Sequence, residues 1–396
     1  YYTEECQREG FDMIVVGDGE RNFQELLLGD INNLSLRLSP SSSPETLIFQ
    51  DSLTEQEMNS YPIPYREKTY IQKYNYLLEG EKSTTIINSR GCPMGCLFCE
   101  DRRTIGRWFS PQHFKKEIQS ILDLGIKGIV IFDDLFTISP KKIKPYTDIL
   151  KRFHQEHEVI YRCFGHAGVI SRHPEMAYML SESGCVEVGF GAESASQEIL
   201  NLIGKGTKVY QMHDLVENLI QAGVKVKAFF MIGLPAETEE TFQETYDFIK
   251  KYRLKYSSFF DFDCSGFFPY KGTVIGDVAR LPEGKTMIVN RQKVDRTFFK
   301  IRAKDDLSWS KIDDGSHGAY KKKRGVSDIV TESYDWKEDK MLLSAKRIKE
   351  LKEKAMLLSG RYSDSMGNRI QTPLIEGSIG SLISLKMSDQ PTSYEV

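Results

Sequence analysis

The sequence predicts a parallel α/β fold, and three observations support this prediction. From about residue 84 onward, short runs of β-branched and aromatic residues alternate with longer amphipathic stretches. The first of these stretches begins with Ser110-Pro111, a serine N-cap followed by a first-turn proline. Gly125, Gly184 and Gly223 each stand just past an apolar stretch, where a left-handed helix C-cap is expected. Strands and helices that alternate in this way form either an open parallel sheet or a partial barrel.

The strands and helices can be assigned in order along the chain. Apolar, β-rich runs predict six strands, at residues 84–89, 128–132, 159–164, 186–191, 225–232 and 257–264. Helical spacing predicts helices between them, at residues 111–124, 140–157, 174–183, 197–203 with 210–222, and 239–252. In the first helix, Phe114, Ile118, Ile121 and Leu122 share one face, as they would on a helix packed against a sheet.

The segments before this α/β unit have weaker patterns. Residues 1–37 contain one strand candidate, 11–17, and one amphipathic helix, which cannot close a core of their own. We therefore expect residues 1–37 to be the remnant of a separate domain. Residues 38–80 are predicted to be a linker, because residues 38–66 are rich in Ser, Pro and Thr. Since the chain begins with Tyr1 rather than Met, we also expect that an upstream portion is absent.

The α/β unit is expected to span residues 81–273, and the pattern loosens after it. Residues 274–358 are predicted to form a C-terminal cap that completes a substrate pocket, with a charged helix over residues 338–358. The apolar stripe of that helix consists of Met341, Ala345, Ile348, Leu351, Ala355 and Leu358. Residues 359–396, rich in Ser and Gly, are predicted to be a flexible tail.

Composition excludes several classes of function. The 396 residues include 53 basic and 56 acidic ones, for a net charge of -3, which gives no electrostatic footprint for a nucleic acid or an anionic membrane. The basic run at residues 321–324 is best explained as a solvated loop. The longest apolar stretches, such as residues 228–234, are far shorter than the roughly 18 residues that a membrane-spanning helix needs. With no export signal at the polar N-terminus, the sequence predicts a soluble, cytoplasmic protein.

Three of the seven cysteines lie close together and indicate a metal centre. Cys92, Cys96 and Cys99 fall within eight residues, directly after the first predicted strand, whereas the other four are isolated. Such a local triplet in a large chain without an export signal indicates metal binding in a reducing compartment. Three cysteines are one fewer than a closed iron-sulfur or structural zinc site usually has, so a four-iron cluster would keep one iron free. A zinc site completed by a distant ligand, and three thiols that merely pack, are the alternatives.

The pattern Cys-x3-Cys-x2-Cys, with Phe98 before the third cysteine, resembles the signature loop of the radical S-adenosylmethionine superfamily. The resemblance implies a 4Fe-4S cluster held by Cys92, Cys96 and Cys99, with S-adenosylmethionine chelating the fourth iron. An electron from the cluster would cleave S-adenosylmethionine to a 5'-deoxyadenosyl radical that abstracts hydrogen from a small-molecule substrate. The resemblance also implies a partial (β/α)6 TIM-type barrel and a reducing partner such as flavodoxin or ferredoxin.

Further segments are similar to those that hold S-adenosylmethionine in this family. Asp133 and Asp134 end the second strand, where the family has acidic residues near the ligand's amine, although Asp134 has the alternative role of capping the following turn. Glu193 follows the glycines of the fourth strand, and a carboxylate there suits the hydroxyls of the ligand's ribose. Phe98 belongs to this predicted cofactor-binding set because it precedes Cys99 in the signature.

The remaining matches to the family are two cations and one turn. Arg162 and Lys205 correspond to positions where related enzymes hold a cation against the ligand's carboxylate, and the alternative for Lys205 is a solvated side chain. Gly233 begins a Gly-Leu-Pro turn that resembles the family's turn beside the adenine, and it also suits an ordinary strand-to-helix connection. The loop at residues 268–273 is similar to the family's Pro-Tyr-Pro-Gly-Thr loop. No residue is assigned as catalytic.

The N-terminal segment resembles one branch of the superfamily. Gly17-Asp18-Gly19-Glu20, with Phe23 after it, is similar to the last strand and helix of a Rossmann-like cobalamin-binding domain that precedes the barrel. This resemblance implies cobalamin as a further cofactor and methyl transfer to an unactivated carbon or phosphorus centre. The Asp-x-His-x2-Gly motif of many such domains is absent from the sequence. Without cobalamin, the alternatives are radical oxidation, cyclisation or methylthiolation.

Two other classes of protein remain as alternatives to an enzyme. An iron-sulfur electron carrier usually ligates every iron within a short chain, whereas this sequence places three cysteines in a predicted barrel. A nucleic-acid-binding protein would need a wider basic patch than residues 321–324 provide.

Overall fold

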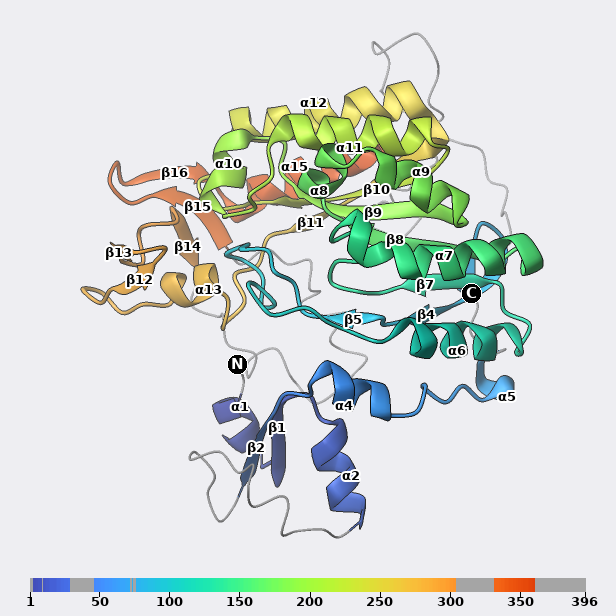
Figure 1. Cartoon of the computed structure of the whole chain (residues 1–396). Coiled ribbons are helices and arrows are strands. Elements are labelled where there is room, and N and C mark those ends of the chain that lie inside the picture. Colours follow the sequence, from blue (N-terminus) through green and yellow to red (C-terminus); the bar gives the residue numbers. More distant parts are fainter. Residues whose placement is uncertain are drawn as a thin grey trace, which may run out of the picture.

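The computed structural model describes residues 3–8, 10–28, 46–71, 73, 76–303 and 331–359. Its main body is a curled seven-stranded sheet with the order β11-β10-β9-β8-β7-β4-β3 (Figure 1). The strands are β3 (Leu77–Leu78), β4 (Glu81–Ile86), β7 (Gly128–Ile131), β8 (Ile160–Gly165), β9 (Cys185–Glu193), β10 (Lys225–Ile232) and β11 (Phe260–Gly266). From β4 to β11 each strand pairs in parallel with the next along the chain, and β3 adds an antiparallel edge.

This strand order distinguishes a partial barrel from a doubly wound open sheet. A doubly wound sheet reverses its strand order at a switch point, whereas here the six parallel strands follow each other in chain order. The helices that connect them lie along one side of the sheet (Figure 1). They are α6 (Pro111–Leu122), α7 (Pro140–His157), α8 (Ala167–Arg172), α9 (Glu175–Glu182), α10 (Gln197–Leu202), α11 (Val209–Gln221) and α12 (Glu239–Tyr256). The predicted partial (β/α)6 barrel is therefore confirmed.

The core lies between the sheet and these helices. In β10, alternate residues from Val226 to Ile232 are buried and the residues between them are half-buried, as in a strand with one covered face. The helices start where the sequence predicts, because Ser110, Ser139 and Thr238 each accept a hydrogen bond from a backbone N–H of the first turn. The last predicted strand begins later than expected, since residues 257–259 form a 3-10 turn and β11 starts at Phe260.

The N-terminal unit, residues 3–28 and 46–60, contains more structure than the sequence predicted. Its elements are α1 (Thr3–Arg8), β1 (Met13–Gly17), α2 (Glu20–Leu28), β2 (Leu47–Asp51) and α4 (Glu55–Ser60). The linker prediction is wrong for residues 47–60, because β2 pairs in parallel with β1 and Thr54 caps α4. The apolar run that forms β2 is short, and it follows a stretch rich in Ser and Pro, so the sequence pattern indicated a linker there. The connection to the barrel then passes through α5 (Lys68–Ile71).

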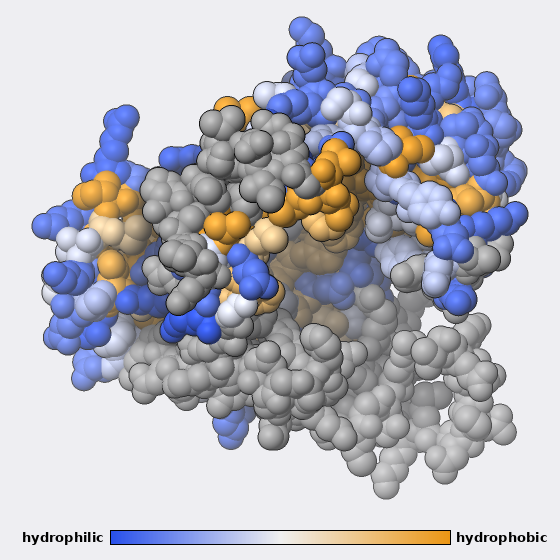
Figure 2. All heavy atoms as spheres, turned by 90° about the horizontal axis from the view of Figure 1, so that it is seen from below, coloured by the Kyte–Doolittle hydropathy of each residue, from blue (hydrophilic) through white to orange (hydrophobic). Residues whose placement is uncertain are grey.

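Much apolar surface of the N-terminal unit is exposed in the structure. The two-stranded sheet of β1 and β2 buries little, and the large apolar side chains left exposed include Phe11, Met13, Phe23, Leu27 and Leu28. Seen from below, the molecule also shows apolar surface gathered beside a hollow rather than spread evenly (Figure 2). A sheet of two strands is too small to be stable alone, so the unit depends on what it packs against.

The C-terminal region is a mixture of small sheets and helices. It consists of α13 (Val274–Ala279), the hairpin β12 (Met287–Val289) and β13 (Gln292–Val294), the sheet β14 (Ile301–Ala303), β15 (Thr331–Asp335) and β16 (Lys340–Leu343), and α15 (Ala345–Leu357). The helix predicted over residues 338–358 begins only at Ala345, because Ser344 caps it, and Met341 lies in β16. Ile348, Leu351 and Ala355 are buried as the predicted stripe requires.

Two predictions fall on parts of the chain that the structure does not describe. The basic run at residues 321–324 lies outside the described residues, and so does the predicted tail from residue 360 onward. In the part that is described, no helix is both long enough and apolar enough to cross a membrane.

Candidate metal centre

The three clustered cysteines lie on a loop closed by a short pair of strands. We define the cysteine loop as residues 91–106, between β5 (Ser89–Arg90) and β6 (Arg107–Trp108), which pair antiparallel at its base. Across the loop, the Thr104 N–H donates to the Cys92 carbonyl at 3.0 Å, and the Cys92 N–H donates to the Thr104 hydroxyl at 2.7 Å. Gly91 has a φ of +92°, and a Cβ there would approach the Thr104 hydroxyl to 2.8 Å. Only glycine therefore suits the entrance of the loop.

The barrel and α13 of the C-terminal region hold the middle of the cysteine loop through Leu97. The Leu97 N–H donates to the Ile203 carbonyl at 2.9 Å, and the Leu97 carbonyl accepts from the Ile275 N–H at 3.0 Å. Its side chain is buried, and a Cβ on Gly204 would come within 2.9 Å of it. Because Leu97 lies between Cys96 and Cys99, these contacts fix the part of the loop that carries the second and third cysteines.

The three thiols are close enough to affect each other's ionisation. Cys96 is buried, Cys92 and Cys99 are half-buried, and all three are free thiols. Burial raises the pKa of each thiol; the neighbouring thiol of the triplet raises it further, and the cation of Lys205 acts in the opposite direction. Three thiols on one loop, with a cation beside them, fit the donor set of a 4Fe-4S cluster.

A single metal ion and a four-iron cluster require different arrangements of their protein ligands. Among the described residues, no three His, Cys, Asp or Glu side chains are placed to hold one ion together. A four-iron cluster instead gives each cysteine its own iron, so the thiolates surround the group rather than converge on one point. The four other cysteines of the chain lie elsewhere, and Cys163, Cys185 and Cys264 are buried in the barrel core.

Two predicted cofactor residues form a buried ion pair beside the cysteines. The Lys205 ammonium lies 2.7 Å from the Glu193 carboxylate, and each side chain is only 10% exposed. Lys205 also lies 5.8 Å above the centre of the Phe98 ring. Burial lowers the pKa of Lys205, but Glu193 and the thiols of Cys96 and Cys99 outweigh this effect and raise it overall. The structure thus brings Phe98, Glu193 and Lys205 together at the cysteine loop.

A glycine makes room for this ion pair. Glu193 ends β9 with a φ of +61°, so its side chain turns back over the strand. A Cβ on Gly191 would lie 2.2 Å from the Glu193 carboxylate and 2.7 Å from the Lys205 ammonium. Packing therefore explains the second glycine of the Gly-Phe-Gly sequence in β9, because any side chain at residue 191 would collide with the ion pair.

Asp133 and Asp134 fasten the entrance of the cysteine loop. Asp133 is buried and accepts hydrogen bonds from the Asn88 N–H at 2.6 Å and the Ser89 hydroxyl at 2.8 Å. Burial raises the pKa of Asp133 to about 6, although these hydrogen bonds oppose the shift. Asp134 accepts from the Gly91 N–H at 2.9 Å. In the structure both carboxylates thus bind the backbone or side chains that lead into the loop.

Arg162 and Gly233, the other predicted cofactor residues, have different surroundings. Arg162 donates to the Tyr76 hydroxyl at 3.1 Å and lies 3.3 Å from the Glu187 carboxylate, inside the barrel wall. Its predicted role toward a ligand's carboxylate stays a prediction. Gly233 has a φ of +88°, and a Cβ there would meet Ile348 of α15 at 2.8 Å.

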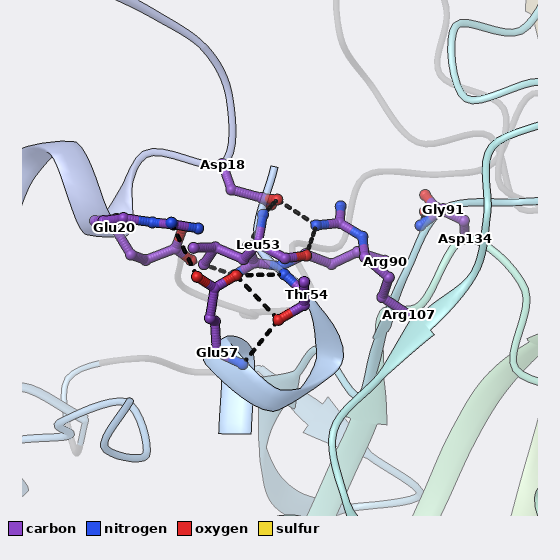
Figure 3. A network of polar contacts seen from close by, with 10 residues as sticks. Asp18, Glu20, Leu53, Thr54, Glu57, Arg90, Gly91, Arg107 and Asp134 are labelled. Carbon is purple, nitrogen blue, oxygen red and sulfur yellow. Dashed lines mark hydrogen bonds and ion pairs between the residues drawn. The ribbon is translucent and has the colours of Figure 1, made fainter. Parts of the chain in front are cut away.

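The charged contacts at the base of the loop are not evident from the sequence. Figure 3 shows Asp18 of the N-terminal unit facing Arg90 and Arg107, the two arginines that flank the cysteine loop. Glu20 contacts Arg90 as well. The sequence marks Asp18 and Glu20, because they belong to the Gly-Asp-Gly-Glu segment, but it does not indicate their partners, which are far away along the chain.

A hollow of about 500 Å³ lies against the outer side of the cysteine loop. It is lined by Pro93, Arg103, Thr104, Ile105, Gly106, Trp108, Ile138, Ser139 and Lys142. None of the three cysteines lines it, so it borders the loop without being the place where the thiols gather.

Comparisons with known proteins agree with this geometry. The family model described as Radical SAM superfamily matches residues 86–249, which include the cysteine loop, Glu193 and Lys205. The chain is 31% identical over 284 residues to a protein of Pyrococcus horikoshii named uncharacterized methyltransferase PH0819, covering 68% of this chain and 58% of that protein. It is 27% identical over 201 residues to bacteriochlorophyllide d C-12(1)-methyltransferase of Chlorobaculum tepidum, covering 48% of this chain and 41% of that protein.

A solved structure with the same fold also matches. The cobalamin-dependent S-adenosylmethionine radical enzyme OxsB, solved with aqua-cobalamin and S-adenosylmethionine bound, matches with a TM-score of 0.50 and 19% identity. The match covers 59% of this chain and 35% of that one, and at this identity it supports the fold alone. The chain spans 58% or less of the length of both curated relatives.

Proposed function

This chain carries a domain of the radical SAM superfamily, whose members use a 4Fe-4S cluster and S-adenosylmethionine, and from that membership we propose that it performs radical chemistry on a small-molecule substrate. The observation that carries the proposal is the position of three thiols beside the buried pair of Glu193 and Lys205. When bound, the cluster would supply an electron for the reductive cleavage of S-adenosylmethionine, and this chemistry would lead to hydrogen abstraction from the substrate.

The residues of this chain have separate tasks in the proposal. Cys92, Cys96 and Cys99 hold the cluster. Glu193 accepts hydrogen bonds from hydroxyls of the ligand, and Lys205 holds that carboxylate in place through an ion pair that is shielded from water. Asp133 and Asp134 have a supporting role in the proposal: they position the cysteine loop by binding the residues that lead into it, and they do not bind the ligand.

We further propose that the outcome is methyl transfer with cobalamin as a second cofactor. Both curated relatives described above are named methyltransferases, which supports this choice over oxidation, cyclisation or methylthiolation. The N-terminal unit supports the cobalamin part, because its parallel strands and exposed apolar helix have the character of part of a larger domain. We place the end of that unit near residue 60 instead of residue 37, since β2 and α4 belong to it.

The first test measures cleavage of S-adenosylmethionine. The chain is purified without oxygen, supplied with iron and sulfide, reduced, and assayed for 5'-deoxyadenosine. We expect cleavage by the wild type and its loss in Cys96→Ala, because the remaining two thiols cannot hold the cluster. Cys6→Ala, which removes a thiol of α1, is the matched control and should retain cleavage. Iron content and cleavage that survive in Cys96→Ala would refute the proposal.

The second test concerns the methyl group and the cobalamin. Methyl-labelled S-adenosylmethionine is supplied with hydroxocobalamin, and the label is followed into cobalamin and into added substrates. Label on cobalamin supports methyl transfer, whereas 5'-deoxyadenosine without label on cobalamin favours oxidation or cyclisation. We also propose a cytoplasmic location with flavodoxin or ferredoxin as reductant, because reduced thiols and low-potential electrons are both available there.

A further inference from the structure

The two strands that close the cysteine loop each carry an arginine, and both arginines bind the same carboxylate. Arg90 and Arg107 are paired across β5 and β6. The Arg90 guanidinium lies 2.6 Å from the Asp18 carboxylate, and the Arg107 guanidinium contacts the other oxygen of that carboxylate (Figure 3). Asp18 belongs to the turn between β1 and α2 of the N-terminal unit, so one side chain joins this unit to both ends of the loop.

The Asp18 carboxylate is saturated with charge-assisted hydrogen bonds. It is only 8% exposed, and it also accepts the Leu53 N–H at 2.8 Å. Arg107 donates in addition to the Leu53 carbonyl at 2.6 Å, and Glu20 binds the other side of Arg90. Burial alone would raise the pKa of Asp18, but the hydrogen bonds from Arg107, Leu53 and Arg90 outweigh it, so this pKa lies below its usual range. Removal of this carboxylate takes the ion pair away from the part-buried Arg107 and leaves Arg90 with Glu20, so it is costly at Arg107 above all.

The barrel and the N-terminal unit both hold the base of the loop: Asp133 and Asp134 of the barrel bind its entrance, and the N-terminal unit binds the arginines and its exit. Strands β5 and β6 are two residues long, and so short a pair is not stable by itself. Beyond the arginines, the Trp108 N–H donates to Glu55 at 2.9 Å and the Ser110 N–H donates to Asn59 at 2.6 Å. Both acceptors are on α4, so the exit of the cysteine loop is fastened to the N-terminal unit as well as to the barrel, where the Tyr146 hydroxyl donates to the Phe109 carbonyl at 2.7 Å and Trp108 is buried.

We propose that Asp18 is a positioning residue for the cluster, which sets the geometry of the cysteine loop from the N-terminal unit by holding Arg90 and Arg107 together. Arg90 is two residues before Cys92, so contacts that fix Arg90 limit where the backbone can place the first ligand. The inference rests on the proposed function, because it takes the loop to hold a cluster.

The test compares Asp18→Asn with Glu57→Gln. Asparagine keeps the shape of Asp18 but loses its charge, whereas Glu57 makes an ion pair with Arg21 inside the N-terminal unit, at 2.9 Å. Both variants and the wild type are loaded with iron and sulfide, and the rate of iron release to a chelator is measured. Residues that orient metal ligands typically change affinity 10- to 100-fold, so we expect about tenfold faster release from Asp18→Asn and no change from Glu57→Gln. The electron paramagnetic resonance signal of the reduced cluster should shift in Asp18→Asn only.

A double-mutant cycle shows whether Asp18 acts through the arginine. If it does, Asp18→Asn combined with Arg107→Gln releases iron no faster than the worse single variant, because both changes break the same contact. Additive rates, or release by Asp18→Asn at the wild-type rate with an unchanged signal, would overturn the inference. If Asp18→Asn does not fold, as judged by circular dichroism, Arg107→Lys replaces it with the same expectations, since lysine keeps the charge but cannot bridge Asp18 and Leu53. A wild type that holds no cluster at all would instead refute the proposed function.

Discussion

The barrel and the N-terminal unit are built from similar elements but are stabilised in different ways. In the barrel, alternate residues of β10 such as Val226, Ala228 and Phe230 are almost completely buried beneath the helices. In the N-terminal unit, Met13 of β1 is 44% exposed and Leu27 of α2 is 73% exposed. The barrel has a core of its own, whereas the N-terminal unit is joined to the rest by charged contacts such as those of Asp18.

This difference matters because the cysteine loop is held by both regions. The barrel side fixes the loop through Asp133, Asp134 and the hydrogen bond from the Leu97 N–H to the Ile203 carbonyl, and these contacts lie within the matched domain. The N-terminal side fixes its base through ion pairs with Asp18 and Glu20. We therefore infer that the barrel sets the shape of the loop and that the N-terminal unit adjusts the position of its base.

The largest predicted effect is a pH-dependent change in the free energy of unfolding, caused by a buried carboxylate of the barrel. Glu237 is completely buried, one of its carboxylate oxygens has no hydrogen-bond partner, and burial raises its pKa to about 8, against the hydrogen bonds from Gly233 and Leu234. A raised pKa in the folded state gives stability that is present below the unfolded pKa near 4.5 and is lost as the pH rises through 8.

Glu237→Gln should therefore remove the loss of stability that the wild type shows as the pH rises. At about 1.4 kcal/mol for each pKa unit, we expect the variant to be more stable than the wild type by about 2 to 4 kcal/mol at pH 8 and nearly equal to it at pH 5. Urea unfolding at both pH values measures the difference. Glu240→Gln, which replaces an exposed carboxylate in the first turn of α12, three residues after Glu237, is the control and should show no such trend. A difference between the two proteins that stays constant with pH would mean that Glu237 is ionised in the folded protein.

Much of the barrel could be predicted because its signals are local. The bounds of β10 and α7 agree with the sequence analysis, since alternation in one and a serine cap with a proline in the other are visible within a few residues. The thiols were predicted from their local spacing, whereas Glu193 and Lys205 were predicted from the resemblance to segments of the family, and their roles stay predictions. Asp18 could not be connected to its arginines, because they lie 72 and 89 residues away and nothing local in the sequence encodes that contact. In β2 and in the small sheet of β14, β15 and β16 each strand is five residues or fewer, and such runs are ambiguous without their partners.

A substitution of intermediate effect tests the tight packing of the barrel at the candidate site. Gly191→Ala places a methyl group against Glu193 and Lys205, so we expect a loss of about 1 to 3 kcal/mol in unfolding free energy and a loss of S-adenosylmethionine cleavage. The control is Gly19→Ala in the N-terminal unit, where a Cβ meets nothing within 4 Å and the backbone is not left-handed. Thermal unfolding and 5'-deoxyadenosine formation are measured for both. Cleavage at the wild-type rate in Gly191→Ala would show that the ion pair can move away without consequence.

The smallest expected effect examines the exposed helix of the N-terminal unit. Leu27→Ser removes an apolar side chain that is mostly exposed, so the unfolding free energy should change by no more than about 0.5 kcal/mol. Leu215→Ser, at a fully buried position of α11, should cost several times more, because it leaves a cavity and buries a hydroxyl. Urea unfolding of the two variants gives both values. A loss above about 1 kcal/mol for Leu27→Ser would mean that the outer face of α2 is covered in solution. The contrast between a region with its own core and one held by charged contacts would then fail at this helix, and Asp18 would become one contact among many.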